Sequence, residues 1–191
     1  MRRYGGSTSA RLAVGLLAAA STCACYTTLD PTILERTGST GGSGGSGALP
    51  PCSFADSGAT QYVVCSAPLA YSQAAADCAA RGATLAAIET EAENQVVASI
   101  AFGVVETNVW LGGTRDESLV WTWPGGSVFW RGDRAGSAEP GAYAHWQPGE
   151  PNNSSTVSSD PERCLAMTAA ESDWNDRSCS VLAPYVCELT P

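Results

Sequence analysis

Oxygen-bearing side chains recur in three short segments in the last quarter of this chain. The segments are Glu150-Pro151-Asn152, Glu162 and Asn175-Asp176. Hard cations such as Ca²⁺ take about six to eight oxygen ligands, which proteins supply mainly as carboxylates and amide carbonyls. Glu150 and Asn152 would face the same side if Pro151 turned the chain tightly, as a cis X-Pro bond does. The three segments together predict a calcium site.

The same residue types are common in turns, where their side chains bond to the nearby backbone. Any one of these segments alone would be interpreted as an ordinary loop. Two of them lie beside cysteines, however, because Glu162 comes before Cys164 and Asn175-Asp176 before Cys179. A bond between these cysteines would bring both segments together without a helix or strand to present them. Their order beside cysteines favours the metal site.

Eight cysteines but only one histidine occur in the 191 residues, and none of the cysteines forms a CxxC pair. Zinc sites and redox motifs are therefore disfavoured, and the cysteines indicate disulfides in an oxidising compartment. A formal net charge of −9, with Lys and Arg scattered along the chain, offers no basic patch for phosphate backbones. We expect no nucleic-acid partner.

The N-terminal quarter has the composition of an export leader followed by a tether. Residues 1–25 hold a basic start, an apolar run too short to span a bilayer, and then Cys23 and Cys25. Cys23 resembles the acylated cysteine of a bacterial lipoprotein, and the alternative is plain signal-peptide cleavage nearby. Residues 26–49 are rich in Gly and Ser and predict a flexible linker. We expect an extracellular or cell-surface protein, an outer-membrane lipoprotein if Cys23 is acylated, and no other membrane attachment.

Two helices are predicted at the start of the remaining domain, residues 50–191. Ser72 is placed to cap a helix over 73–81, whose inward face includes Cys78. Thr90 and Glu93 form a capping box for a second helix.

Strands and long loops are predicted after Asn108. Short apolar runs separated by Gly, Pro and Asn give strands over 109–111, 119–123, 164–167 and 185–189. The stretch between Pro124 and Pro161 shows little regular pattern and is expected to be a functional loop. The class is therefore α+β. Four of the six tryptophans are expected in the core and two, Trp130 and Trp146, are candidates for stacking on a ligand.

Residues from about Cys52 to Glu188 resemble a long-form C-type lectin domain. The resemblance rests on the helix with Cys78, Leu85-Ala86-Ala87-Ile88, Trp110-Leu111-Gly112, Trp121-Thr122-Trp123, Glu150-Pro151-Asn152, Trp174-Asn175-Asp176 and Cys187-Glu188. It implies the C-type lectin-like fold, with antiparallel sheets and an irregular calcium-binding loop region. It also implies three disulfides, namely Cys52 with Cys65, Cys78 with Cys187, and Cys164 with Cys179.

The resemblance further implies a Ca²⁺ cofactor and a sugar ligand. The metal ligands would be Glu150, Asn152, Glu162, Asn175 and Asp176, of which the first four would also hydrogen-bond sugar hydroxyls. Glu-Pro-Asn implies mannose-type sugars with vicinal equatorial hydroxyls, whereas the galactose type carries Gln-Pro-Asp. An accessory calcium site would need acidic residues where Asn153 and Arg163 stand, so a second site is expected to be weak or absent.

The sequence therefore predicts calcium-dependent binding of mannose-like glycans by an exported lectin. The alternative is a protein-binding domain of the same fold in which calcium only stiffens the loops. An enzyme is not expected, because a calcium shell of this kind lacks the nucleophile and tuned base of a hydrolase. Arg131-Gly132-Asp133 matches an adhesion tripeptide, which in a Gly-rich loop is interpreted as chance.

Overall fold

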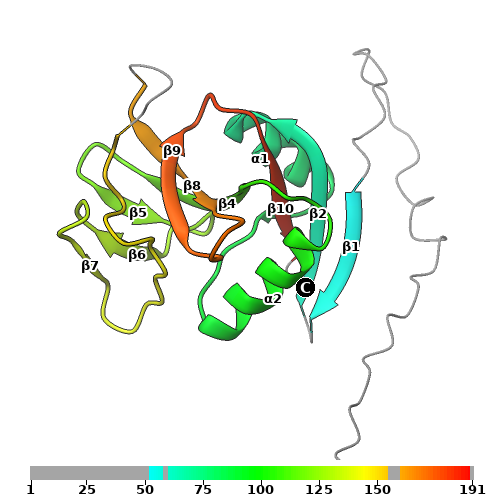
Figure 1. Cartoon of the computed structure of the whole chain (residues 1–191), viewed down its shortest axis with the longest axis horizontal. Helices are drawn as coiled ribbons and strands as arrows, with labels where there is room; N and C mark the ends of the chain where they lie inside the picture. The colour runs from blue at the N-terminus through cyan, green and yellow to red at the C-terminus, as the bar shows by residue number, and fades with distance from the viewer. Residues whose placement is uncertain (1–51, 58–59, 155–159, 190–191) are drawn as a thin grey trace, which may run out of the picture. The chain divides into compact units, whose positions relative to one another are not determined.

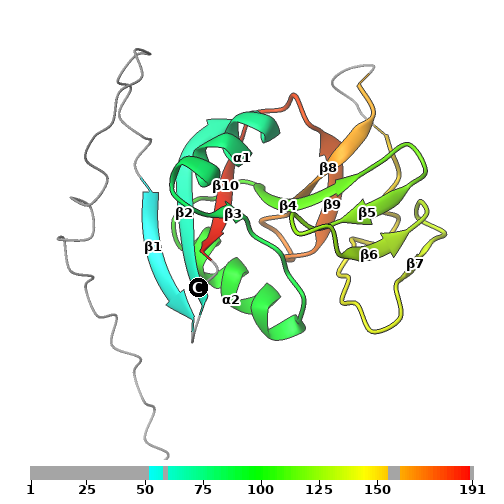
Figure 2. The same ribbon diagram turned by 180° about the vertical axis from the view of Figure 1, so that it is seen from behind.

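Residues 52–57, 60–154 and 160–189 are described by the computed structural model of this protein (Figures 1 and 2). The predicted leader over 1–25 with Cys23, and the linker over 26–49, lie outside these residues. Within them, neither helix is long and apolar enough to cross a membrane.

Helix α1 (Tyr71–Ala80) begins earlier than the sequence predicts. Its N-cap is Ala70, so the expected capping role of Ser72 is wrong and Ser72 lies within the first turn. Contacts of Tyr71 account for the difference, because its N–H donates to the Cys179 carbonyl at 3.0 Å and its hydroxyl to the Gly112 carbonyl at 2.7 Å. Tertiary contacts of Tyr71 thus help to set the start of α1, where the Gln73 side chain also accepts a 3.3 Å hydrogen bond from the Ala70 N–H.

Helix α2 (Glu91–Phe102) begins where the sequence predicts. The Thr90 hydroxyl accepts a 3.1 Å hydrogen bond from the Glu93 N–H, and the Glu93 carboxylate accepts one of 3.0 Å from the Thr90 N–H. The predicted capping box is confirmed.

Ten strands complete the part of the chain that the structure describes. Their bounds are β1 (Cys52–Ser57), β2 (Thr60–Leu69), β3 (Thr84–Leu85), β4 (Val109–Arg115), β5 (Val120–Thr122), β6 (Val128–Arg131), β7 (Ser137–Ala138), β8 (Glu162–Met167), β9 (Trp174–Ser178) and β10 (Ala183–Leu189). The main path is β1-β2-β10-β4-β5-β6-β7, with β8 pairing β4 and β9 pairing β8. The predicted α+β class is confirmed, whereas β6 and β7 correct the expectation of an irregular stretch from Pro124 to Pro161.

Alternation along the central strands divides the core into two layers. In β4, Val109 and Leu111 pack into the cluster that includes α2, while Trp110 packs into the cluster that includes α1. Strands β2, β8 and β10 alternate in the same way, because successive side chains point to opposite faces of a sheet. The four strands are consequently buried on both faces, with α1 and α2 on opposite sides (Figures 1 and 2).

The three implied disulfides are all present. Cys52–Cys65 joins β1 to β2, Cys78–Cys187 joins α1 to β10, and Cys164–Cys179 joins β8 to the chain just after β9. The last of these lies at the strand pair that carries Glu162, Asn175 and Asp176. The framework therefore fixes the two strands that carry three of the five candidate ligands.

Candidate calcium site

Two of the three candidate segments lie on one strand pair. Glu162 begins β8, and Asn175 and Asp176 lie in β9, whose ladder to β8 sets Ala166 opposite Asn175 and Leu165 opposite Asp176. This corrects the idea that a disulfide alone would bring these segments together without a strand. The Cys164–Cys179 bond reinforces an antiparallel ladder that already positions them.

The third segment is held against β9 by backbone hydrogen bonds. The Trp174 N–H donates to the His145 carbonyl at 2.7 Å, and the Gln147 N–H donates to the Trp174 carbonyl at 2.8 Å. The chain then reaches the Glu150–Pro151 peptide bond, which is cis. The loop that carries Glu150 and Asn152 is thereby placed beside Asn175 and Asp176.

Asp176 joins this loop to the strand pair from a fully buried position. One carboxylate oxygen accepts the Asn152 N–H and the other accepts the Asn153 N–H, each at 2.9 Å. The side chain is 0% exposed, so these two bonds replace the water that a carboxylate would otherwise bind. Asp176 thus fixes the backbone of the loop from inside.

Glu150 and two amide side chains form the outer part of the cluster. The Asn152 amide donates to the Glu150 Oε1 at 2.7 Å, and the Asn175 amide approaches the same oxygen at 3.5 Å. The other oxygen, Oε2, is buried and has no hydrogen-bond partner in the part of the chain that the structure describes. A buried carboxylate oxygen without a donor is costly unless a cation or another donor satisfies it.

Mutual repulsion and burial disturb the ionisation of these carboxylates. Burial and the neighbouring Asp176 carboxylate raise the pKa of Glu150 to about 7. Burial and the charge of Asp176 likewise raise the pKa of Glu162, which is 9% exposed. Three carboxylates gathered in a poorly hydrated place disfavour full ionisation, and a divalent cation among them would remove that penalty.

The donor set fits a hard cation. Hydrogen bonds join Glu150 to Asn152 and Asn175, and Asn152 to Asp176, while the charges of Glu162 and Asp176 act on each other. These residues offer carboxylate and amide oxygens, which suit Ca²⁺. Among the described residues, only Cys52, Cys65 and Asp77 bring three acidic or thiol ligand atoms within 4.8 Å of one another, and both sulfurs there are in a disulfide. The carboxylate oxygens of Glu150, Glu162 and Asp176 are spaced more widely than this. The unpartnered Glu150 Oε2 and the raised pKa of Glu150 therefore favour the oxygen cluster around Glu150 as the cation site.

The two tryptophans considered as stacking platforms are integrated into the core edge. Trp146 packs edge-on against Trp121, with ring centroids 4.8 Å apart, and against Trp130 at 6.1 Å. Both Trp130 and Trp146 are partly buried against the core that includes α2. The four tryptophans expected in the core, Trp110, Trp121, Trp123 and Trp174, are each at most 5% exposed, which confirms that expectation.

The adhesion-like tripeptide is engaged within its own loop. Arg131 forms an ion pair with Glu139, and the Asp133 carboxylate accepts a 2.9 Å hydrogen bond from the Ala135 N–H. Both charged side chains of the tripeptide therefore have local structural partners.

Two residues near the site were not anticipated from sequence. Arg115, at the end of β4, donates to the Glu162 carbonyl, and Asn94 of α2 accepts from the Trp174 indole. Asn94 is 2% exposed and shares the buried stripe of α2 with Val97 and Ala101, so a polar residue on an apolar helix face was the available clue. Arg115 follows an apolar strand without a comparable pattern.

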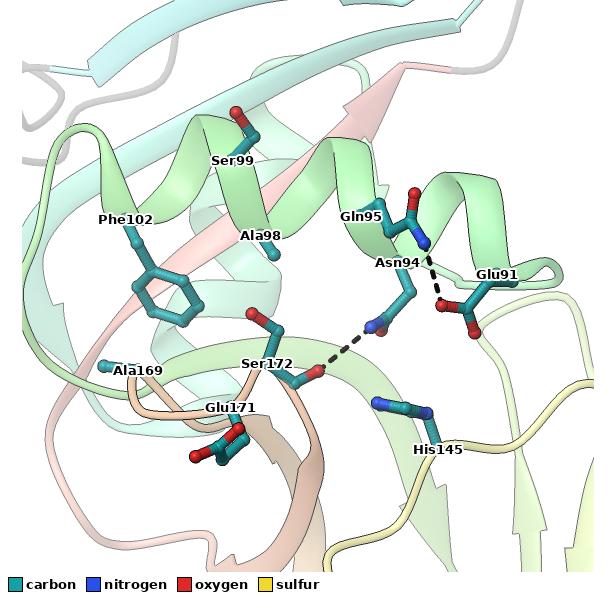
Figure 3. Close-up of a pocket in the computed structure, with 10 residues that line it drawn as sticks. All are labelled: Glu91, Asn94, Gln95, Ala98, Ser99, Phe102, His145, Ala169, Glu171 and Ser172. Carbon is teal, nitrogen blue, oxygen red and sulfur yellow. Dashed lines mark hydrogen bonds between the residues drawn. The ribbon is translucent and has the colours of Figure 1, made fainter.

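A separate hollow of about 460 Å³ lies between α2 and the segment that precedes β9 (Figure 3). Asn94 reaches across it and donates to the Ser172 carbonyl at 3.0 Å, while His145 lies on the far side. None of the five candidate ligands lines this hollow. We therefore assign the candidate chemistry to the oxygen cluster and not to the larger concavity.

Comparison with known proteins assigns the fold and the family. The model of the lectin C-type domain family matches residues 67–189. Over 125 residues, the chain is 29% identical to human C-type mannose receptor 2, with 64% of this chain covered. That match covers only 7% of the receptor.

Two solved structures show that one fold accompanies different ligand requirements. A calcium-independent type II antifreeze protein is 24% identical with a TM-score of 0.56, over 72% of this chain and 92% of that chain. The carbohydrate-recognition domain of cow CD23, solved with a GlcNAc2Man3 oligosaccharide, is 23% identical with a TM-score of 0.57, over 71% and 91%. The C-type lectin-like fold is confirmed, and the ligand must be inferred from the oxygen cluster.

Proposed function

Because this chain belongs to the C-type lectin domain family, we propose that it binds carbohydrate through a calcium ion held by Glu150, Asn152, Glu162, Asn175 and Asp176. The observation that carries this proposal is the buried Glu150 Oε2, which has no partner among the described residues, although the Asn152 amide donates to the other oxygen of the same carboxylate. A bound Ca²⁺ would satisfy this oxygen and offset the repulsion between the carboxylates.

The same side chains suit direct recognition of a sugar. An ion held from one side by protein oxygens keeps coordination positions for two vicinal hydroxyls, since Ca²⁺ takes up to about eight ligands. Glu150 and Asn152 offer an acceptor and a donor at the rim, where such hydroxyls can hydrogen-bond. The order Glu-Pro-Asn supports the proposal of mannose-type sugars with equatorial hydroxyls.

Binding, and not catalysis, is the role that we propose. The family members compared above are named for receptor, antifreeze and carbohydrate-recognition properties. Three disulfides support an oxidising, extracellular or cell-surface location. We also propose that a lipid on Cys23 anchors the protein to the outer membrane.

Isothermal titration tests both halves of the proposal. Calcium should bind the chelator-treated protein, and mannose should then bind weakly and only when calcium is present. Asp176→Ala should abolish both calcium and mannose binding. Asp160→Ala, which also removes an acidic side chain near β8, should keep both. If calcium binds but a panel of monosaccharides and glycans does not, the carbohydrate proposal fails and the protein-binding alternative replaces it.

Sugar preference can be tested by exchanging the two rim side chains. The double variant Glu150→Gln with Asn152→Asp retains oxygen ligands while changing which positions donate and accept hydrogen bonds. We expect it to lose mannose binding and to gain affinity for galactose. An unchanged preference would show that other residues, and not these two, select the sugar.

A further inference from the structure

Arg115 connects the two sides of the candidate calcium site. It is the last residue of β4, and the ladder to β5 sets it opposite Trp121. Its Nε donates to the Glu162 carbonyl at 2.7 Å, and its Nη2 donates to the Asn153 Oδ1 at 2.6 Å. The same Asn153 oxygen accepts the Glu162 N–H at 2.9 Å. One guanidinium thus joins the loop after Pro151 to the start of β8.

The guanidinium is itself well fixed. Its carbon lies 6.0 Å from the centroid of the Trp121 ring, and the side chain is only partly exposed. The charges of Asp176 and Glu162 attract it, although burial opposes them and lowers its pKa. The planar fork of arginine presents two donors at a set angle, which the point charge of lysine does not reproduce.

From these contacts we propose that Arg115 is a positioning residue, an internal cation that holds Asn153 and Glu162 in place before calcium binds. This inference deepens the proposed function and rests on it. Asn153 follows Asn152 directly, and Glu162 is itself a candidate ligand. Because both residues are already fixed, calcium binding costs less conformational entropy in the loop.

The guanidinium also engages two oxygens that could otherwise serve as ligands of a second cation. The Asn153 Oδ1 and the Glu162 carbonyl both accept hydrogen bonds from Arg115. We therefore expect a single calcium ion in this region of the domain.

Positioning and simple electrostatics predict opposite effects of removing Arg115. A positive charge near a calcium site repels the ion, so its loss should tighten calcium binding if charge were its only contribution. If Arg115 instead holds the ligands in place, its loss should weaken calcium binding. The sign of the change therefore distinguishes the two roles.

Calcium titration of three variants makes this comparison. Arg115→Gln and Arg115→Lys should each bind calcium about tenfold or more weakly than the parent, because two charge-assisted hydrogen bonds are lost or misplaced. The matched control is Arg163→Gln, which removes the same charge beside Glu162 from an exposed pair with Glu117. It should stay within about twofold of the parent or bind more tightly. Calcium binding by Arg115→Gln as tight as the parent's, or a stoichiometry of two, would overturn the proposal.

Amide hydrogen exchange in chelator provides a test that does not depend on calcium binding. The N–H groups of Asn153 and Glu162 should be protected in the calcium-free parent and exchange about tenfold faster in the Arg115 variants. If the parent binds no calcium, the proposed function fails, while protection at these two amides still decides the role of Arg115. Equal protection in parent and variant would refute it. If Arg115→Gln does not fold, Arg115→Lys carries both measurements.

Discussion

The indole N–H of Trp174 donates a 2.9 Å hydrogen bond to the Oδ1 of Asn94, which links β9 to α2 across 80 residues of sequence. The amide of Asn94 also donates to the Ser172 carbonyl at 3.0 Å. One buried side chain therefore holds both the strand that carries Asn175 and Asp176 and the turn that leads into it (Figure 3). Helix α2 lies outside the candidate site, yet through Asn94 it helps to position the strand that carries two of the candidate ligands.

We predict that Asn94→Ala destabilises the domain by about 2 kcal/mol or more, because it leaves the Trp174 N–H and the Ser172 carbonyl without partners in the core. Thermal unfolding monitored by circular dichroism would measure this loss. Gln95→Ala is the matched control, since Gln95 is exposed and bonds only to Glu91 among the described partners. It should change the stability by less than about 0.5 kcal/mol. Equal effects would contradict a special role for Asn94.

Gly112 should not tolerate a side chain. A Cβ at this position would lie 2.6 Å from the Leu85 carbonyl oxygen and 2.6 Å from the Pro124 ring. Because the first of these atoms is backbone, Gly112→Ala would force β3 and β4 apart, and we expect a loss of about 2 kcal/mol or more in unfolding free energy. Urea denaturation checks the value. Gly125→Ala, where a Cβ meets nothing within 4 Å, should leave the denaturation midpoint nearly unchanged.

Local patterns in the sequence predict the elements whose formation is local. The capping box of Thr90 and Glu93 gives the start of α2, and the alternating apolar runs give β4, β8 and β10. The start of α1 could not be predicted in this way, because contacts of Tyr71 with residues distant in sequence determine it. Strands β6 and β7 were missed because they are short and one of their ladders is interrupted by an irregular register.

The candidate ligands could be proposed from sequence because two of the three segments lie beside cysteines and the third contains Pro151 between Glu150 and Asn152. Their supporting partners could not, since Arg115 precedes Asn153 by 38 residues and its two acceptors are defined only after folding. A backbone carbonyl such as that of Glu162 carries no sequence information about what will bind it. The sequence was thus sufficient to propose the candidate ligands, whereas the residues that support them were identified only from the structure.

The disulfides should differ in their effect on stability. The Cys52–Cys65 bond spans 13 residues and the Cys78–Cys187 bond spans 109. Replacing each pair with alanine should lower the unfolding free energy by about 3 kcal/mol for the first and about 5 kcal/mol for the second, in the chain-entropy description. Denaturant titration of the two double variants measures the difference. Comparable losses would show that residual structure in the unfolded chain dominates.

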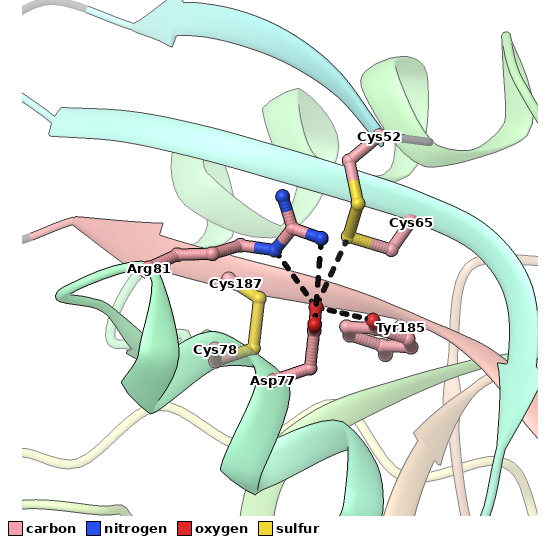
Figure 4. Close-up of polar contacts among 7 residues, drawn as sticks. All are labelled: Cys52, Cys65, Asp77, Cys78, Arg81, Tyr185 and Cys187. Carbon is pink, nitrogen blue, oxygen red and sulfur yellow. Dashed lines mark hydrogen bonds and ion pairs between the residues drawn. A yellow bond between two sulfur atoms is a disulfide. The ribbon is translucent and has the colours of Figure 1, made fainter. Parts of the chain in front are cut away.

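A nearly buried ion pair lies between these two disulfides (Figure 4). The Asp77 carboxylate pairs with Arg81 at 2.7 Å, accepts the Tyr185 hydroxyl, and lies 4.0 Å from the Cys65 sulfur (Figure 4). The sulfur is in a disulfide and has no proton to donate, so its contact is one of packing. Asp77→Asn should destabilise the domain by about 2 kcal/mol or more, because it removes the nearly buried negative charge that pairs with the slightly exposed Arg81. Thermal unfolding of Asp77→Asn beside the exposed control Asp56→Asn tests this, and similar melting temperatures would contradict it.

The raised pKa of Glu188 predicts that stability depends on pH through a residue outside the candidate calcium site. Burial and the charges of Glu93 and Glu89 raise its pKa, although the Ala87 N–H donates to it at 2.9 Å. A carboxyl group whose pKa is higher in the folded state favours folding when protonated, and this contribution is lost as pH rises above its unfolded value of roughly 4.3. Glu188→Gln retains an acceptor for Ala87 without the charge. Its melting temperature should match the parent near pH 4 and exceed it by about 2 °C at pH 7, after allowance for solvent screening. Glu171→Gln, an exposed change of equal charge, should show no such divergence, and a Glu188→Gln protein less stable than the parent at pH 7 would contradict the assignment.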